Sequence, residues 1–316
     1  MTPLDPSVAT GRNLVRTALT DLGPGSRIVV AVSGGADSLA LAQVTAFVAG
    51  QESWDLRAVI VDHQLQDGSA DVAREAAKQL AGIGIDTEVV TVEVGRDGGP
   101  EAAARSARYA VLESQDADAI LLGHTLDDQA ETVLLGLGRG SGPRSIAGMA
   151  PVNGIFRRPF LKLRRTETEQ ICRATDLTWW VDPHNSDPAY RRARIRSELM
   201  PVLEDVLGGG AAEAIARTAE QVRSDGACLD AIADAIDDPL NVASLASLAP
   251  ALRSRVLRRT ALAAGANPSE LSAAHLAEID RLVTDWHGQL RIELPGGVAC
   301  VRVGDSLAYV TTPVGG

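Results

Sequence analysis

Cysteine is scarce in this chain of 316 residues, and its three cysteines lie far apart, at positions 172, 228 and 300. An odd number without a Cys-x-x-Cys pair indicates neither a disulfide framework nor a zinc site. Long apolar stretches are also missing, since none reaches the roughly 18 residues that a membrane helix needs. The first residues lack the basic and apolar regions of a secretion signal. We therefore expect a cytoplasmic protein without a membrane partner.

Basic residues are outnumbered by acidic ones, 30 to 41, and the net charge of −11 argues against nucleic-acid binding over the whole surface. The basic residues are grouped, however. The three groups are Arg139, Arg144, Arg157, Arg158, Lys162, Arg164 and Arg165; then Arg191, Arg192, Arg194 and Arg196; then Arg253, Arg255, Arg258 and Arg259. One such group is typical of a solvated surface. Three groups in an acidic chain favour a local track that binds phosphates.

The first half of the chain alternates apolar strands with helices. We expect strands at 28–32, 56–63, 87–94 and 119–123, with helices at 39–44 and beyond, 70–80 (capped by Ser69), 101–115 and 126–138. This alternation predicts an α/β fold with a doubly wound, mostly parallel sheet. In such sheets the ligand lies at the carboxyl ends of the strands. Residues 33–38, 62–63 and 124–128 all lie at the carboxyl ends of these strands and should meet there.

The second half is expected to become mainly helical. Residues 141–165 form an ordered loop region in this interpretation, followed by a helix at 166–175, a short strand at 179–181 and a helix at 191–199 that Pro201 ends. The glycines at 208–210 mark the boundary between a first domain, 1–207, and a second, 211–316. The smaller domain is expected to be helical, with turns at 295–297 and 304–305 in a C-terminal β-hairpin.

The most informative segment is Ser33-Gly34-Gly35-Ala36-Asp37-Ser38, where a strand enters a glycine turn that opens a helix. Glycine permits a tight turn, and the first N–H groups of a helix are unpaired and carry partial positive charge, so the segment suits a phosphate. Glycines alone would also fit an ordinary turn capped by Asp37 or Ser38. The segment has neither the Walker lysine nor the Rossmann glycine spacing.

Two further segments carry chemistry. In the segment 124–132, Asp128 and Glu131 share one helix face, and the helix dipole would account for acids there but not for His124. Asp37 and Asp128 could meet from adjacent loops to hold Mg²⁺. In the segment 101–109, Arg105 could bind a phosphate, although by spacing alone it forms a routine helical pair with Glu101.

Together these segments resemble known enzymes. Residues 33–38 resemble the loop of the PP-loop ATP pyrophosphatases, which split ATP into AMP and pyrophosphate. Their order with 101–109, 124–132, 139–149 and 185–196 resembles the tRNA(Ile)-lysidine synthase family over roughly residues 25–200. The resemblance implies that ATP adenylates the C2 carbonyl oxygen of the wobble cytidine in a tRNA(Ile) with a CAU anticodon. The amine of free L-lysine then displaces AMP to form lysidine. Thr125, Ser145, Ile146 and Ala193 depart from the family pattern.

The resemblance implies roles for individual residues. Asp37, Arg105, His124 and Asp128 would act in catalysis, and Ser33, Gly34, Gly35, Asp37, Ser38 and Asp62 would bind ATP. Asp37 and Asp128 would hold Mg²⁺, while Asp62, Asp128 and Glu131 are alternatives for binding or deprotonating lysine. The tRNA would contact a basic region at 139–200 and the second domain. The individual residues expected to contact it are Arg108, Arg139, Arg144, Arg158, Arg192 and Arg196. Phe156, Phe160 and Tyr190 are candidates for stacking on a base, although each alone suits a core.

Other functions remain open at this point. A PP-loop enzyme that thiolates tRNA cytidine would usually need paired cysteines, and amidotransferases or NAD synthetases of this kind would need ammonia delivery. A non-catalytic, ATP-sensing α/β protein is a third alternative. The sequence does not reveal the oligomeric state, although a homodimer would suit a substrate as long as tRNA.

Overall fold

The structure, a computed structural model, describes residues 4–64, 68–93, 95, 99–140, 142–182, 187, 189–288 and 291–311. Their contacts divide the chain into two units. Unit 1 comprises Met1–Leu135 and Gly148–Arg217, and unit 2 comprises Gly136–Ala147 and Thr218–Gly316. The contacts thus change inside helix α10 (Ala211–Asp234). The expected boundary at glycines 208–210, between domains 1–207 and 211–316, stays a prediction.

Unit 1 contains a six-stranded sheet in the order β3-β2-β1-β4-β6-β5, parallel except for β5. Its strands are β1 (Arg27–Val32), β2 (Asp55–Asp62), β3 (Asp86–Thr91), β4 (Ala119–Leu122), β5 (Val152–Asn153) and β6 (Phe156–Arg157). The expected doubly wound sheet is confirmed. The strand order reverses between β1 and β4, and a ligand site is expected outside the carboxyl ends of strands at such a point.

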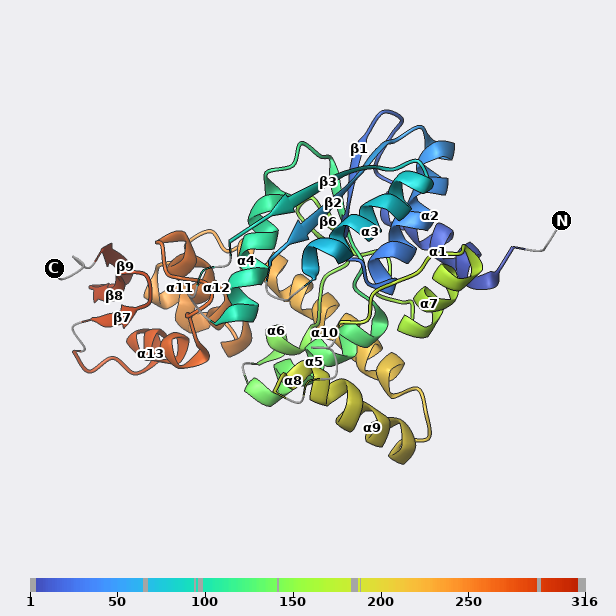
Figure 1. The fold of residues 1–316 in the computed structure, drawn as a ribbon. Helices are drawn as coiled ribbons and strands as arrows, with labels where there is room; N and C mark the ends of the chain where they lie inside the picture. Colours follow the sequence, from blue (N-terminus) through green and yellow to red (C-terminus); the bar gives the residue numbers. More distant parts are fainter. Residues whose placement is uncertain are drawn as a thin grey trace. The chain divides into compact units, whose positions relative to one another are not determined.

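Helices pack on both faces of this sheet (Figure 1). Helices α1 (Pro6–Ala18), α2 (Ala36–Glu52), α3 (Ser69–Gly82) and α7 (Arg165–Ala174) contribute to the core on one face, and α4 (Pro100–Glu113) contributes to the core on the other. Helix α5 (Leu126–Arg139) follows β4. Alternate residues of the buried strand β1 face opposite ways. Val30 packs in the core with α1, α2, α3 and α7, whereas Val29 packs on the other face with Leu112 of α4.

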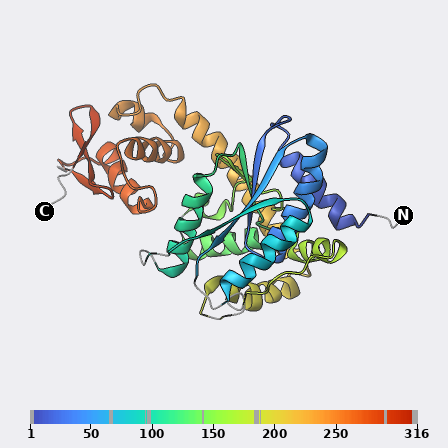
Figure 2. The ribbon, with the colours of Figure 1, turned by 45° about the horizontal axis from the view of Figure 1, so that its top comes forward.

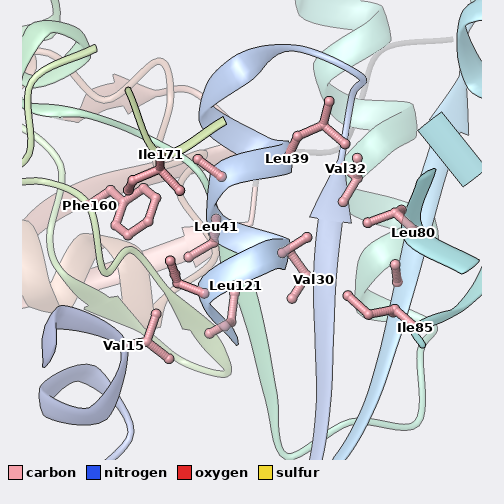
Figure 3. Packing of buried hydrophobic residues seen from close by; sticks show 14 of the residues in the cluster. Val15, Val30, Val32, Leu39, Leu41, Leu80, Ile85, Leu121, Phe160 and Ile171 are labelled. Atoms are coloured by element: carbon pink, nitrogen blue, oxygen red, sulfur yellow. The ribbon is translucent and has the colours of Figure 1, made fainter. Parts of the chain in front are cut away.

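Helix α2 is central to the larger core. Figure 3 shows Leu41 between the β1 side chains and Phe160 with Ile171, and all of these labelled side chains are buried. Burying a side chain of this size contributes about 1.5–3 kcal/mol. The helix that follows the glycine turn is therefore held firmly against strand β1, which fixes the position of residues 33–38.

Three local expectations were wrong. Helix α3 is capped by Gly68, with φ of 84°, and Ser69 is its first residue. Residues 179–181 form no strand. The helix at 191 does not stop at Pro201, because α8 (Arg191–Arg194) continues through a π-helical turn (Ile195–Leu199) into α9 (Met200–Val206). Pro201 is the second residue of α9, directly after this π-helical turn.

Unit 2 contains α6 (Pro143–Ile146), α11 (Val242–Ser247), α12 (Pro250–Ala263) and α13 (Ala273–Thr284). Its C-terminal strands are β7 (Ile292–Leu294), β8 (Val298–Val303) and β9 (Ser306–Thr311), which form a three-stranded antiparallel sheet instead of a single hairpin (Figure 2). Both expected turns, at 295–297 and 304–305, join these strands. Among the described residues, no helix has the length and apolar character needed to span a membrane.

Candidate active site

The loop at 33–38 makes the tight turn that its glycines predict. Gly34 adopts φ of +81°, and a β-carbon there would lie 2.9 Å from Val72 Cγ1. The Ser38 hydroxyl donates to the Gly35 carbonyl and accepts from the Ser33 N–H at 3.1 Å. Helix α2, 17 residues long, begins directly after Gly35. The loop therefore presents a helix N-terminus, which favours an anion.

A cavity of about 490 Å³ lies at this loop, where the strand order reverses between β1 and β4. Its walls include eight of the expected site residues, namely Ser33, Gly35, Asp37, Ser38, Arg108, His124, Asp128 and Arg196. Gly123 also lines it, and a β-carbon at Gly123 would lie 3.0 Å from the carbonyl oxygen of Asp37. Glycine at the end of β4 thus allows the two loops to approach each other.

Asp37 and Asp128 are brought together by an arginine from α7. The Nε of Arg165 donates to Asp37 Oδ2 at 3.2 Å, and its Nη2 donates to Asp128 Oδ1 at 2.8 Å. The second oxygen of Asp37 accepts from the Thr168 hydroxyl, and that of Asp128 accepts from the Thr125 N–H and hydroxyl. Both oxygens of each carboxylate are therefore engaged.

Glu131 forms the deepest part of the same cluster, with a side chain that is 1% exposed. Both of its carboxylate oxygens accept from Arg196, at 2.7 and 3.1 Å, and Arg165 Nη1 lies 3.9 Å away. Such a bidentate pair is stronger and more directional than a single hydrogen bond. Arg196, which was expected at the tRNA, thus holds Glu131 in place.

The electrostatics of this acidic cluster (Asp37, Asp128, Glu131) follow from burial and two guanidinium groups. Burial raises the pKa of Asp37 and of Glu131 above their ordinary values, against the opposing effect of the arginines. Burial also acts to raise the pKa of Asp128, but Arg165 and the Thr125 N–H outweigh it, so that this pKa is lowered. Burial lowers the pKa of Arg165, but the three carboxylates reverse this and raise it.

A further cation, Arg108, lines the same cavity, and none of the described carboxylates forms an ion pair with it. Its Nε and the Nδ1 of His124 are buried without a hydrogen-bond partner among the described residues. Burial lowers the pKa of His124 to about 3, so its imidazole is neutral at neutral pH. A partly buried guanidinium that pairs with none of the described carboxylates is a place where a phosphate would be stabilised.

Asp62 lies apart from the acidic cluster. It lines a second, smaller cavity of about 200 Å³, with His63, Ser33 and Trp180 among its other walls. The Asp62 carboxylate accepts from the Gln64 N–H at 3.0 Å. Trp180 also lines the larger cavity, and its backbone N–H donates to the Gly34 carbonyl at 3.0 Å. The segment expected as a strand therefore lies against the glycine loop.

The other expected contacts are dispersed. Arg105 is exposed and donates to the Tyr109 hydroxyl, outside both cavities. Arg158 is buried and donates to the Ala150 carbonyl, and Arg144 pairs with Asp230 within unit 2. Arg139 is exposed at the end of α5, and Arg192 is partly buried near Arg108. Ser141, Asn185 and the Glu101 side chain lie outside the described part of the structure.

The aromatic candidates separate clearly. Phe160 and Phe156 are 0% and 5% exposed, which excludes them as platforms for an RNA base, whereas Tyr190 is 36% exposed. Sequence reasoning also missed Arg165, Thr168 and Trp180 as site residues. Arg165 was visible only as one member of a basic group. The threonine three residues later, on the same face of α7, was the remaining signal.

Comparison with known proteins identifies the family of this chain. The PP-loop domain family matches residues 11–203, and the TilS substrate binding domain family matches residues 240–307. A tRNA(Ile)-lysidine synthase of Thermobifida fusca is 52% identical over 92% of this chain and 94% of its own length. That of Streptomyces coelicolor is 50% identical over 89% and 84%.

A solved structure supports the fold. The U34-tRNA thiolase NcsA from Methanococcus maripaludis, determined with its [4Fe-4S] cluster, has a TM-score of 0.58 over 68% of this chain and 79% of its own. Its identity of 20% extends the likeness to the fold alone. The sequence similarity, by contrast, spans both matched regions, and the chain belongs to the tRNA(Ile)-lysidine synthase family.

Proposed function

We propose that this protein ligates free L-lysine to C2 of the wobble cytidine in a tRNA(Ile) with a CAU anticodon, using ATP. The observation that carries the proposal is the agreement between two independent features. Relatives with this name match nearly the whole chain, and the loop at 33–38 lines a cavity to which Asp37, Asp128 and Arg108 also contribute. The reaction needs both carboxylates and cations, because it joins an amine to a centre activated by a phosphate.

The nucleotide would lie with its phosphates at the loop. The N–H groups that begin α2 and the hydroxyl of Ser33 offer hydrogen bonds, and Arg108 offers positive charge where pyrophosphate leaves. Arg105, by contrast, lies on the exposed side of α4, so Arg108 is better placed for that task. A neutral His124 can donate or accept a hydrogen bond near the reacting phosphate without adding charge.

Lysine would bind at the acidic cluster. Its side-chain amine has a pKa near 10.4, so forming the neutral nucleophile at neutral pH costs about 4.6 kcal/mol. Desolvation beside Asp128 and Glu131 could lower this cost, because a buried carboxylate can accept the proton. Glu131 has the raised pKa that suits such a base. Asp62 faces the smaller cavity and is less well placed.

Mg²⁺ would be held by Asp37 and Asp128 in place of Arg165, whose guanidinium lies between them. Their oxygens are hard ligands from the first turns of α2 and α5, and Mg²⁺ in such sites is usually completed by phosphate oxygens and water. Among the described residues, no group of three or more histidine, cysteine or acidic side chains is arranged to hold a metal. The ion would therefore need the nucleotide, and when bound it would neutralise phosphate charge.

The tRNA would contact the remaining basic residues. Arg139 and Arg192 are expected at phosphates, together with Arg144 if its pair with Asp230 opens, and Tyr190 offers an exposed ring for a splayed base. Arg158 and Arg196 would first have to break internal contacts. We place this work in the cytoplasm, and a homodimer stays a prediction that sedimentation velocity can test.

Incorporation of labelled lysine tests the proposal directly. Purified protein, ATP, Mg²⁺ and a CAU-anticodon tRNA(Ile) transcript should give lysine-labelled RNA and pyrophosphate in equal amounts. Sulfide in place of lysine should give none, since Cys172 and Cys300 are buried separately and Cys228 is exposed. Sulfur incorporation would favour the thiolase. ATP binding with no pyrophosphate release, even with tRNA, would favour the sensor.

A further inference from the structure

The position of Arg165 is not explained by RNA binding. Its guanidinium lies between the two carboxylates expected to hold Mg²⁺, and donates to one oxygen of each, Asp37 Oδ2 and Asp128 Oδ1. The side chain is 24% exposed, and its backbone N–H is also held, by Asp127 at 2.8 Å. A cation is therefore already present where the metal would bind.

We propose that Arg165 is a built-in counter-cation which keeps divalent metal out of the acidic cluster until the nucleotide arrives. This inference rests on the proposed use of Mg²⁺. Without nucleotide, the three carboxylates of the cluster are balanced by two guanidinium groups, Arg165 and Arg196, which leaves one negative charge. A dication gains little from such a site and is repelled by the fixed guanidinium.

The contacts of the other carboxylate oxygens strengthen this reading. Asp37 Oδ1 is held by Thr168 and Asp128 Oδ2 by Thr125, so the oxygens that face Arg165 are the ones a metal would need. Thr168 and Arg165 both belong to α7, three residues apart, so one helix supplies the counter-cation and fixes the carboxylate. The phosphates of ATP would add negative charge and tip the balance toward metal.

Arg165 is thus a positioning residue, and its role predicts a gain of function. Removing its charge should let the nucleotide-free protein bind a divalent ion that the unchanged protein binds poorly. The experiment measures free Mn²⁺, as a stand-in for Mg²⁺, by electron paramagnetic resonance at fixed pH and without nucleotide. Arg165→Gln should bind Mn²⁺ at least about tenfold more tightly, since a unit charge at contact distance has been removed.

Two further variants locate the effect. Arg27→Gln makes the same change at the exposed start of β1, the strand end opposite the glycine loop, and should leave Mn²⁺ binding unchanged. Adding Asp37→Asn to Arg165→Gln should cancel the gain, because a shared ligand is lost. Arg165→Lys retains the charge and should bind Mn²⁺ as weakly as the unchanged protein.

A measurement on the unchanged protein covers the case in which Arg165→Gln does not fold. The Nε–H resonance of Arg165, assigned by its loss in Arg165→Lys, should shift when Mg²⁺ and a non-hydrolysable ATP analogue are added together, but not with Mg²⁺ alone. Equal Mn²⁺ affinity in folded Arg165→Gln and Arg27→Gln, or an Nε–H resonance that never responds, would overturn the proposal. Neither readout depends on lysine transfer, so the two proposals can fail separately.

Discussion

Replacing Asp128 tests the site most directly, because this side chain joins the acidic cluster to the loop after β4. In Asp128→Asn the amide oxygen can still accept from the Thr125 N–H, while the charged contact with Arg165 is lost. Arg165 keeps Asp37 as a partner, so the cost in stability should stay near the lower end for a charged hydrogen bond, about 1–2 kcal/mol. Unit 1 should then unfold about 2–8 °C lower.

Activity should fall much further than stability. The loss of one preorganised charge at a reacting centre typically costs about 10²–10³ in rate, and we expect lysine incorporation and pyrophosphate release to fall by at least that factor. Asp128→Ala should be equally inactive but less stable, by about 2–4 kcal/mol, because it leaves the buried Thr125 N–H unpaired.

The control for these variants is Asp116→Asn, which removes an exposed carboxylate paired with Arg27 and should leave both quantities unchanged. The assay compares initial rates with the CAU-anticodon transcript and thermal unfolding of the same samples. Pyrophosphate release by Asp128→Asn at the unchanged rate, with a normal unfolding temperature, would refute the assignment of Asp128 to the reacting centre.

Three other changes test separate features. Gly123→Ala should destabilise unit 1 by about 1–3 kcal/mol and weaken binding of an ATP analogue, since its β-carbon would press on the Asp37 carbonyl; normal calorimetric values would contradict this. In native protein only Cys228 should react quickly with a thiol reagent at pH 8, because burial raises the pKa of Cys172 to about 12 and of Cys300 to about 11; two fast thiols would be inconsistent. Burial also raises the pKa of Tyr309, so above about pH 10 the unfolded chain loses a proton that the folded one keeps, and stability falls by about 1.4 kcal/mol per pH unit. Tyr309→Phe should lack this loss, and urea unfolding at pH 9 and 11 should therefore show the two proteins converging in stability; a constant difference would argue against it.

The sheet and its site could be predicted because the signals are local. Apolar runs at 28–32 and 119–122 give buried strands, and polar residues directly after each run must lie at the same edge of a parallel sheet. The sequence alone therefore predicted that Asp37 and Asp128 lie near each other. The same reasoning failed at Trp180, because an apolar pair that fits a strand equally fits a loop segment packed on a cavity.

The role of the arginines could not be predicted from local sequence patterns. A count of charge along the sequence predicts a surface track, but it does not reveal which acids are buried. Four of the seven basic residues between 139 and 165, namely Arg157, Arg158, Arg164 and Arg165, are buried or paired within unit 1. Arg165 finds its partners 37 and 128 residues away in the sequence.

An acidic protein that buries carboxylates at its reacting centre must also supply cations to them, because an unpaired buried charge is too costly to retain. Those cations come from the same basic segments that a substrate such as RNA would need. In this chain the packing of α7 against α2 determines which basic residue pairs with the acidic cluster, because it brings Arg165 to Asp37 at the start of α2. The end of the basic segment, where Arg165 begins α7 and Thr168 follows three residues later, is therefore better interpreted as part of the catalytic pocket than as an RNA-binding surface.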